Sequence, residues 1–525
     1  MTIKVLVSDK LSPLAAEIFT KRGIHVDTKI GLSPEELEAI IGEYHGLAIR
    51  SSTTVTKEIL AKATNLKVVG RAGIGVDNVD VPAASAHGVV VMNTPFGNSV
   101  TTAEHTIAMM MSLARSIPQA SSSTHQGKWE KNRFMGTELY GKTLGLIGCG
   151  NIGSIVADRA HGLKMKVVAF DPYLSPDRAR DIHVEKVELD ELFARADFIT
   201  LHTPLNEGTR NIIGKTNIAK MKKGVYIINC ARGGLIHEGE LKEALEAGHV
   251  AGAALDVFEI EPAKENILFG LDNVICTPHL GASTGEAQVN VALQVAEQMA
   301  DYLLDGSVTN AVNMPSVSAE DAAKLRPYFT LAEQLGSFAG QIIETGIKEI
   351  HVEYLGSVSK LNTKPLTAVA LKGLLSALMD GVNMVNAPVI AKDRNIRVSE
   401  TTSPDVADYQ SLIRINVTTE RRTRNVSGTL FAGSPRIVEL HGTKLEASTS
   451  ARMLYVNNED KPGLIGALGK LLGDAQINIA NFHLGRNAEG SDAVALVEVD
   501  QDISPELKKA IAELPSVKQV QVIAL

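Results

Sequence analysis

Three side chains that suit acid–base chemistry each follow an apolar segment of the chain. Arg232 follows VYIINCA, Glu261 follows ALDVFEI and His279 follows VICTP. A histidine can accept a hydroxyl proton, a carboxylate can orient that histidine, and an arginine can hold a carboxylate of a substrate. Removal of a hydride from a hydroxy acid requires this set of groups. Taken singly, each residue has a plainer interpretation: Arg232 as a surface charge, Glu261 as a solvated loop residue and His279 as a packed core histidine.

A glycine pattern that suits a dinucleotide precedes these residues. Gly148, Gly150 and Gly153 form G-x-G-x-x-G between a strand-like segment and the helix-like NIGSIVADRAHG, and the next strand-like segment ends on Asp171. The first glycine permits the tight turn, the second lets a pyrophosphate approach the backbone, and the third lets the helix pack on the sheet. Asp171 would accept hydrogen bonds from the adenine ribose and repel a 2′-phosphate, so we expect NAD rather than NADP.

The elements that must position these groups alternate between strand-like and helix-like segments. One series runs from IKVLVSD to VVVMNTP and a second from KTLGLIG to NVICTPH. Such alternation predicts parallel sheets that are covered on both faces and bind ligands outside the carboxyl ends of their strands. The fold class we expect is therefore α/β, with two doubly wound parallel-sheet domains (flavodoxin-like and Rossmann). All three acid–base residues then lie at the edge that holds the glycine loop.

The rest of the chain predicts mixed α+β structure. The segment SVTNAVNMPSVSAED, from Ser307, changes composition and is typical of a linker. Residues 317–450 mix helix-like and β-rich stretches, which predicts an α+β intervening domain. The residues from 451 onward follow the order strand, helix, strand, strand, helix, strand, which is the ferredoxin-like βαββαβ arrangement.

Composition limits the partners. The chain has 525 residues, a formal net charge of −8 and a pI near 6.0, which argues against nucleic acid or an anionic membrane as the main partner. The start MTIKVLVSDK lacks a signal-peptide core, and we find no apolar run long enough to cross a membrane, so we expect a cytoplasmic protein. The densest basic cluster, Arg421, Arg422 and Arg424, is expected on a solvated hairpin.

The cysteines carry no metal or redox pattern. Cys149, Cys230 and Cys276 lie within or beside apolar segments, and no C-x-x-C or other metal-ligand spacing is present. This arrangement predicts buried, reduced thiols and no metal site.

The same motifs carry a resemblance to a known family. GCGNIG, NCARGGLI, DVFEIEP and PHLGAS resemble the D-2-hydroxyacid dehydrogenase family over residues 1 to about 315. The resemblance implies that Arg232, Glu261 and His279 are the catalytic residues. It also implies a set of residues around NAD: Gly148, Gly150, Asn151, Ile152, Gly153, Asp171, Thr203, Cys230, Ala231, Arg232, Asp256, His279 and Gly281.

Further segments resemble the branch of this family that acts on 3-phosphoglycerate. These are IRSSTTVT, GRAGIGVDNVD, NTPFGNSVTTAEHTIAMM and GKWEKNRFMGTEL. Arginine suits a phosphate because its planar fork matches the phosphate oxygens. The resemblance implies a substrate site of Arg50, Ser51, Arg71 and Asn98. Arg133 or Lys131 is expected to add charge, either to this site or to that of a neighbouring subunit. A structural salt bridge is the alternative interpretation of Arg71.

The resemblance also divides the chain. It implies a substrate-binding domain of residues 1–98 and 288–316 around an NAD-binding domain of residues 99–287. An intervening domain (317–450), similar to an allosteric-substrate-binding domain, and an ACT domain (451–525) follow. The sequence departs from the family by placing His237 where an acidic residue is common. The family further implies a homo-oligomer, a tetramer by expectation.

The C-terminal domain is expected to bind L-serine as an effector. A βαββαβ unit has helices on one face only, so it commonly pairs with a second copy and encloses small ligands at the interface. Asp460, just before a helix, can meet an ammonium group, and the helix N-terminus suits a carboxylate. Asn478 offers both a donor and an acceptor. The alternative is that Asp460 only caps the helix.

Two other functions compete with this interpretation. One is a different D-2-hydroxyacid dehydrogenase, acting on 2-hydroxyglutarate or glyoxylate, which would need neither the long tail nor Arg50. The other is a non-enzymatic NAD-sensing protein that works by association. The tail and the phosphate-binding arginines count against both.

Overall fold

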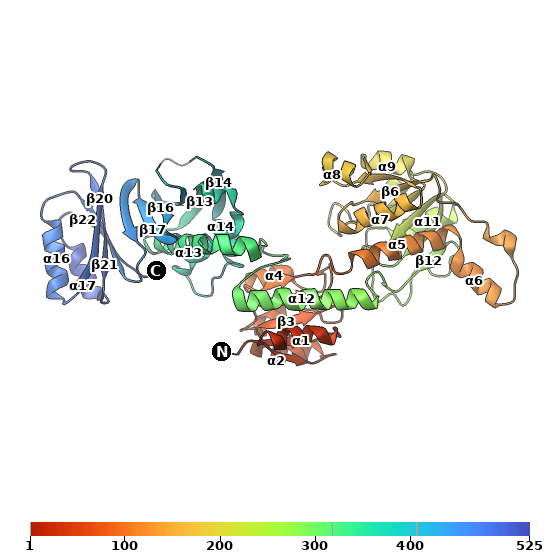
Figure 1. Cartoon of the computed structure of the whole chain (residues 1–525), viewed down its shortest axis with the longest axis horizontal. Helices are drawn as coiled ribbons and strands as arrows, with labels where there is room; N and C mark the ends of the chain where they lie inside the picture. Colours follow the sequence, from red (N-terminus) through yellow and green to blue (C-terminus); the bar gives the residue numbers. More distant parts are fainter. Residues whose placement is uncertain (1, 318, 406–407) are drawn as a thin grey trace.

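The described residues form an elongated molecule with four sheets, shown in Figure 1. The structure is a computed structural model that describes residues 2–317, 319–405 and 408–525. The first two sheets lie in the right and lower parts of Figure 1, and the tail with the other two sheets lies at the left.

The first sheet is parallel, with strand order β2-β1-β3-β4-β5, which is the flavodoxin-like order. Residues 285–305 return to it as α12, whose Val295 and Met299 pack against Gly70 of β4. Helix α12 begins where the Thr284 side chain accepts a hydrogen bond from Ala287 N–H and ends at Gly306 in left-handed conformation. The bounds are β1 Lys4–Val7, α1 Pro13–Lys21, β2 His25–Thr28, α2 Pro34–Ile40, β3 Gly46–Ile49, α3 Lys57–Lys62, β4 Val68–Arg71, α4 Val81–Ala86, β5 Val90–Met92 and α12 Gly285–Asp305.

The second sheet is also parallel, with strand order β12-β11-β10-β9-β6-β7-β8. The order reverses between β6 and β9, which creates the crevice where doubly wound sheets bind ligands. Helix α5 leads into this sheet, and α6 projects away from it (Figure 1). The bounds are α5 Ser99–Ala114, α6 Ile117–His125, β6 Thr143–Ile147, α7 Asn151–Gly162, β7 Lys166–Phe170, α8 Pro176–Asp181, β8 Glu185–Lys186, α9 Leu189–Arg195, β9 Phe198–Leu201, α10 Lys215–Ile218, β10 Val225–Asn229, α11 Glu238–Glu246, β11 Val250–Leu255 and β12 Val274–Cys276.

The tail contains a six-stranded sheet, β14-β13-β15-β16-β17-β18, and a four-stranded antiparallel sheet, β20-β21-β19-β22. The second order is that of a ferredoxin-like unit. The bounds are α13 Ala319–Gln341, β13 Ile347–Gly356, α14 Lys364–Ser376, α15 Ala387–Asp393, β14 Arg397–Ser403, β15 Ser411–Thr419, β16 Thr423–Phe431, β17 Ser434–Leu440, β18 Thr443–Ser448, β19 Met453–Glu459, α16 Leu464–Asp474, β20 Ile479–Arg486, β21 Asp492–Val499, α17 Pro505–Ala512 and β22 Val517–Ile523.

The two tail sheets share one hydrophobic core. Phe338 of α13 packs edge-on against Tyr455 of β19, with ring centroids 5.9 Å apart, and Met453 and Leu496 belong to the same cluster. Helices α16 and α17 cover the opposite face of the four-stranded sheet through Leu468 and other apolar residues. The face that we expected to be open to a second copy is therefore covered by α13 of the same chain.

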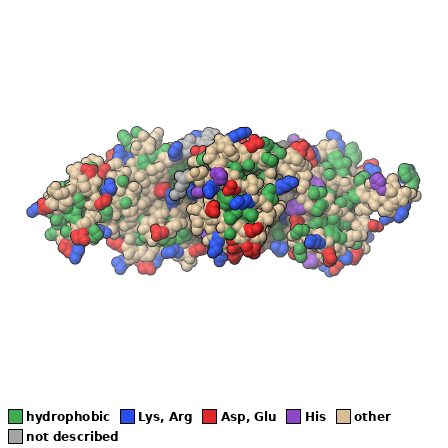
Figure 2. Space-filling model, turned by 90° about the horizontal axis from the view of Figure 1, so that it is seen from below, with side chains coloured by type: hydrophobic (Ala, Val, Ile, Leu, Met, Phe, Trp, Pro, Cys, Tyr) green, Lys and Arg blue, Asp and Glu red, His purple; other side chains and the backbone are tan. Residues whose placement is uncertain are grey.

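The predicted fold class is confirmed, with one local correction. Cys149 and Cys230 are buried, but Cys276 is exposed, because it is the last residue of the edge strand β12. None of the described helices combines the length and apolarity that crossing a membrane requires. On the face shown in Figure 2, basic and acidic side chains are interspersed rather than gathered in a basic band.

Candidate active site

The glycine loop has the shape that a dinucleotide phosphate requires. Gly148 has a φ of +91°, and a Cβ at Gly153 would lie 2.3 Å from the Gly148 carbonyl oxygen. A Cβ at Gly150, by contrast, would meet nothing within 4 Å. The first glycine thus makes the turn, the third lets α7 pack closely, and the second leaves its outer side open. Asn151 and Ile152 begin α7, so a pyrophosphate at this loop would face a helix N-terminus.

Asp171 lies directly after β7, beside the glycine loop. Its carboxylate accepts hydrogen bonds from the Cys149 N–H at 2.8 Å and the Tyr173 N–H at 2.8 Å. These bonds fix the carboxylate at the position where an adenine ribose meets the second strand of a Rossmann sheet. The residues present therefore fit NAD.

His279 and Glu261 form a direct pair. The His279 Nδ1 and the Glu261 Oε2 are 2.6 Å apart, and the other Glu261 oxygen accepts the Phe258 N–H at 3.0 Å. Burial alone would raise the pKa of Glu261, but the hydrogen bonds from His279 and Phe258 hold that pKa below its usual value. The His279 side chain is 51% exposed, so it is not a packed core histidine. Its Nε2 has no partner among the residues that the structure describes.

Asp256 holds the backbone that carries His279. Its side chain is fully buried and accepts hydrogen bonds from the Thr277 hydroxyl at 2.6 Å, the Leu280 N–H at 2.7 Å and the Gly281 N–H at 2.8 Å. The His279 N–H donates to the Asp256 carbonyl, and the φ of His279 is +56°. A buried carboxylate with this many donors fixes the loop, so Asp256 acts on the backbone around His279.

Arg232 reaches from the second sheet toward the first. Its Nε lies 3.2 Å from Asp77 Oδ2, and a Cβ at Gly75 would lie 2.0 Å from its Nη2. The next residue, Gly233, is so close to the Phe258 carbonyl that a Cβ there would lie 1.8 Å from that oxygen. The loops that carry Arg232 and Glu261 are thus in direct contact, and Arg232 projects into the space between the sheets.

Three expected substrate residues lie at the carboxyl edge of the first sheet. Arg50 follows β3, Arg71 ends β4, and Asn98 comes just before α5. Burial, together with the nearby positive charges of Arg232 and Arg50, lowers the pKa of Arg71 to about 10. The Arg71 Nε and the Asn98 Oδ1 are buried and have no hydrogen-bond partner in the described chain. A structural salt bridge for Arg71 is therefore not what the geometry shows.

The other expected contacts lie in different places. Ser51 is exposed beside Arg50, in a loop whose backbone donates to Asp9. Arg133 pairs with Glu130 and Asp272, near the projecting α6. It meets none of the other substrate residues within this chain. The remaining cofactor candidates follow neighbouring strands of the second sheet: Thr203, Cys230, Ala231 and Gly281.

A single copy does not bring the two effector residues together. Asp460 follows the end of β19, whereas Asn478 precedes the start of β20, which runs parallel to β19 because both pair antiparallel with β21. They lie at opposite ends of the sheet. Asp460 pairs with Arg486 at 2.5 Å, while the Asn478 amide donates to Asp500. The N-cap of α16 is Gly463, so Asp460 does not cap that helix.

The structure adds positioning residues that the sequence patterns did not indicate. Asn229 is buried at the end of β10, where its amide donates to the Arg232 carbonyl and accepts the Ala231 N–H. Glu238 accepts the Glu259 N–H at 2.9 Å and the Asn266 amide at 2.7 Å, and so anchors both ends of the loop that carries Glu261. In the sequence, Asn229 could have been noticed as an asparagine at the end of an apolar strand. No pattern in the sequence indicated Glu238.

His237 also acquires a structural explanation. Its Nδ1 accepts the Glu240 N–H at 3.2 Å and caps α11. An acidic residue there would cap the helix in the same way. Among the described residues, no group of three or more His, Cys, Asp or Glu side chains is arranged to hold a metal ion.

Three segments match known protein families. Residues 107–281 match the NAD binding domain of the D-isomer specific 2-hydroxyacid dehydrogenases, residues 324–441 the D-3-phosphoglycerate dehydrogenase intervening domain, and residues 452–516 the ACT domain.

Relatives match over the whole chain. The chain is 42% identical to a D-3-phosphoglycerate dehydrogenase of Bacillus subtilis, over 99% of each chain, and 43% identical to one of Methanocaldococcus jannaschii, over 100% of each. Solved structures match part of the chain. A glyoxylate reductase from Paecilomyes thermophila has a TM-score of 0.56 at 29% identity, covering 59% of this chain and 98% of that one. A D-lactate dehydrogenase from Aquifex aeolicus, complexed with NAD and lactic acid, has a TM-score of 0.53 at 26% identity, covering 60% of this chain and 100% of that one.

Proposed function

Because the chain belongs to the D-isomer specific 2-hydroxyacid dehydrogenases, and within them to the D-3-phosphoglycerate dehydrogenases, we propose that it oxidises 3-phospho-D-glycerate to 3-phosphooxypyruvate. This is the first step of the phosphorylated route to L-serine. The observation that carries the proposal is the His279–Glu261 pair, which follows strands of the same sheet as the glycine loop, with the partly buried Arg71 and Arg50 at the carboxyl edge of the first sheet.

The acid–base step follows from the geometry of the pair. Glu261 accepts a hydrogen bond from the Nδ1–H of His279, so the proton of the neutral ring stays on Nδ1. The lone pair of Nε2 is then free to take the hydroxyl proton of the substrate. The carboxylate then stabilises the positive charge that develops on the imidazole. NAD, when bound, supplies the hydride acceptor. Asp256 keeps the His279 loop in place during this proton transfer.

The arginines would bind the two anionic groups of the substrate, its carboxylate and its phosphate. Arg232 would hold the carboxylate of the substrate, because it projects between the sheets from the loop beside Glu261. Arg71, with Arg50, would hold the phosphate, because its buried Nε has no partner within the described residues. A phosphate at Arg71 also relieves the repulsion among the three guanidinium groups.

A turnover assay with the full chain tests the reaction. We expect NAD reduction with 3-phospho-D-glycerate, and a loss of about 10²- to 10⁴-fold in His279→Ala, the usual contribution of an acid–base group. His183→Ala is a matched control, because His183 is an exposed histidine with the same φ of +56°. Equal turnover in wild type and His279→Ala would refute the catalytic role. A preference for 2-hydroxyglutarate or glyoxylate would refute the choice of substrate.

We also propose that L-serine is an effector of a cytoplasmic homo-oligomer. A cavity between β19 and α16 is lined by Asn458, Asp460, Pro462 and Arg486. The Asp460–Arg486 pair offers opposite charges to the ammonium and carboxylate of an amino acid. Asn478 would come from a second copy, since it lies at the other end of the sheet. A tetramer remains our prediction of the subunit number.

Calorimetric titration of L-serine, with activity measured in parallel, tests this control. Binding and inhibition should occur in the wild type and be lost in Asp460→Ala. Asp502→Ala is the control, because Asp502 also pairs with an arginine of this domain, Arg452. A wild-type chain that neither binds L-serine nor slows with it would refute the effector role.

A further inference from the structure

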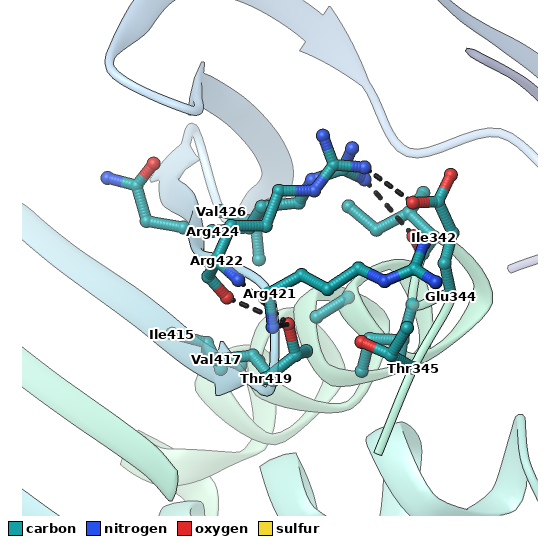
Figure 3. Close-up of a pocket in the computed structure, with 13 residues that line it drawn as sticks. Ile342, Glu344, Thr345, Ile415, Val417, Thr419, Arg421, Arg422, Arg424 and Val426 are labelled. Atoms are coloured by element: carbon teal, nitrogen blue, oxygen red, sulfur yellow. Dashed lines mark hydrogen bonds and ion pairs between the residues drawn. The ribbon is translucent and has the colours of Figure 1, made fainter. Parts of the chain in front are cut away.

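The densest basic cluster of the sequence engages groups of the tail itself. Figure 3 shows Arg421, Arg422 and Arg424 on the hairpin between β15 and β16. Arg422 is exposed, as expected, and pairs with Glu344. Arg424 is half-buried, contrary to the expectation, and donates to the Ile342 carbonyl at 3.2 Å. These contacts lie within the tail, whereas a histidine that the proposed function does not use lies beside the candidate active site.

This histidine, His105, lies on α5 with its ring against the Asp256 carboxylate. Its side chain is 19% exposed, and its Nε2 lies 3.3 Å from Asp256 Oδ1 and 3.3 Å from the Thr277 hydroxyl oxygen. Asp256 is fully buried and forms no other ion pair within the described residues. Burial raises the pKa of the Asp256 carboxyl, and the hydrogen bond from His105 is the largest of the effects that bring this pKa below its ordinary value. His105 is therefore the group that compensates the buried charge most directly.

The hydrogen bonds around Asp256 determine which nitrogen of His105 carries a proton. The Thr277 hydroxyl has one proton and directs it to Asp256 Oδ1, at 2.6 Å. The ionised carboxylate of Asp256 can only accept. Both groups that meet the His105 Nε2 are thus acceptors toward it, so the network places a proton on Nε2. His105 then donates to the carboxylate oxygen that also accepts the Leu280 N–H.

The Asp256 residue in turn fixes the segment that carries His279. Its Oδ1 accepts the Leu280 N–H, its Oδ2 accepts the Gly281 N–H, and its carbonyl accepts the His279 N–H. Three consecutive backbone N–H groups, starting at the acid–base histidine, therefore depend on the position of one buried residue.

Helix α5 contacts this segment a second time, one turn before His105. The buried Thr102 hydroxyl lies at hydrogen-bond distance, 2.9 Å, from the Gly281 carbonyl oxygen. Residues three apart lie on the same face of a helix, so Thr102 and His105 present one face to the segment. The same helix begins directly after Asn98, one of the proposed substrate residues. Helix α5 thus joins the proposed substrate site to the acid–base segment.

We propose that His105 is a positioning residue for the acid–base step. Its Nε2–H holds the Asp256 carboxylate in place and, through the backbone of residues 279–281, holds the Nε2 of His279 at the substrate hydroxyl. His105 takes no part in the proton transfer itself. The inference rests on the proposed function of His279. Because a displacement of about 1 Å can lower a rate by about 100-fold, loss of this bond should appear in kcat.

Kinetics of the full chain with NAD and 3-phospho-D-glycerate test the role. His105→Phe keeps a ring but removes the donor, and we expect kcat to fall by about tenfold or more while the Kd of NADH stays within about twofold of the wild type. His105→Gln should restore kcat to within about threefold, because its amide nitrogen can donate from nearly the place of Nε2. Glu104→Gln, at an exposed neighbour on the same helix, should leave kcat unchanged.

A double variant separates positioning from a general loss of structure. In His279→Ala the acid–base group is already absent, so the addition of His105→Phe should lower kcat further by less than about twofold. A histidine that only stabilised the fold would lower the rate equally in both backgrounds.

Hydrogen–deuterium exchange of the free chain tests the same segment without a substrate. In His105→Phe, the peptide of residues 277–283 should exchange at least about fivefold faster, because the acceptor of the Leu280 and Gly281 N–H groups is less firmly held. His105→Gln should reverse this change, and the glycine-loop peptide of residues 147–153 should exchange as in the wild type.

The outcomes distinguish the two proposals. A wild-type chain that does not turn over 3-phospho-D-glycerate refutes the proposed function, and the exchange of residues 277–283 then decides the role of His105 alone. A kcat of His105→Phe within about twofold of the wild type, an equal fall in the His279→Ala background, or unchanged exchange of residues 277–283 would overturn the positioning role.

Discussion

Replacement of Glu261 by glutamine isolates the contribution of its charge to catalysis. Glutamine has nearly the same shape as glutamate, and its amide oxygen can still accept a hydrogen bond from His279 Nδ1–H. It carries no negative charge, so it cannot stabilise a positively charged imidazole. The bond is short, at 2.6 Å, and joins a carboxylate to a histidine. A hydrogen bond to a charged group contributes about 1.5–3 kcal/mol. At about 1.36 kcal/mol for each factor of ten, the loss corresponds to a fall of about 10- to 150-fold in kcat/KM.

The assay is the initial rate of NAD reduction by the full chain with 3-phospho-D-glycerate, measured from pH 6 to pH 9. Glu265→Gln serves as the matched control, since Glu265 is an exposed glutamate of the same loop with no partner in the described chain. It should retain wild-type kinetics. If Glu261→Gln stays within about threefold of the wild type across this pH range, the Glu261–His279 bond does not serve the reaction.

Two further predictions concern the cofactor and stability. Asp171→Ala should reduce the preference for NAD over NADP, because it removes the carboxylate that would repel a 2′-phosphate; an unchanged ratio of kcat/KM for the two cofactors would contradict this role. Asp256 should make the free energy of unfolding fall at acidic pH. Burial raises its pKa, but bonds from His105 and Thr277 outweigh that effect and hold the pKa below the usual value of about 3.9. The stabilisation is therefore present above that usual value and lost as pH falls through the lower, folded value. The urea midpoint should fall less between pH 6 and pH 3 in Asp256→Asn than in the wild type, and an equal fall would contradict the prediction.

The edge that holds the candidate active site could be predicted from the sequence because strand ends in a parallel sheet are predictable positions. Arg232, Glu261 and His279 each follow a short apolar segment, and the carboxyl ends of such strands meet at one edge. The glycine pattern predicted the position of the dinucleotide loop in the same way. The roles of these residues remain predictions until they are measured, as do the domain boundaries.

Contacts between elements distant in the sequence could not be predicted in this way. Asp77 meets Arg232 only because loops at the carboxyl edges of the two parallel sheets meet, and Glu238 anchors a loop more than twenty residues away. No local pattern encodes either contact. The separation of Asp460 and Asn478, by contrast, follows from the βαββαβ order itself, since the first two strands are parallel and the residues flank opposite ends of them.

The core that α13 shares with the C-terminal sheet decides where this protein can be divided. A chain shortened to end near residue 450 would lose Tyr455 and its neighbours and expose the apolar side of α13 around Phe338, a surface prone to aggregation. A chain shortened after Met314 would keep α12 on the first sheet and the Asn313 contacts to β5, but it would lose Val385 from the core of that sheet and the hydrogen bond from Asn383 to the Gly88 carbonyl. The two tail sheets therefore stabilise each other through one core, and we expect them to be gained or lost together.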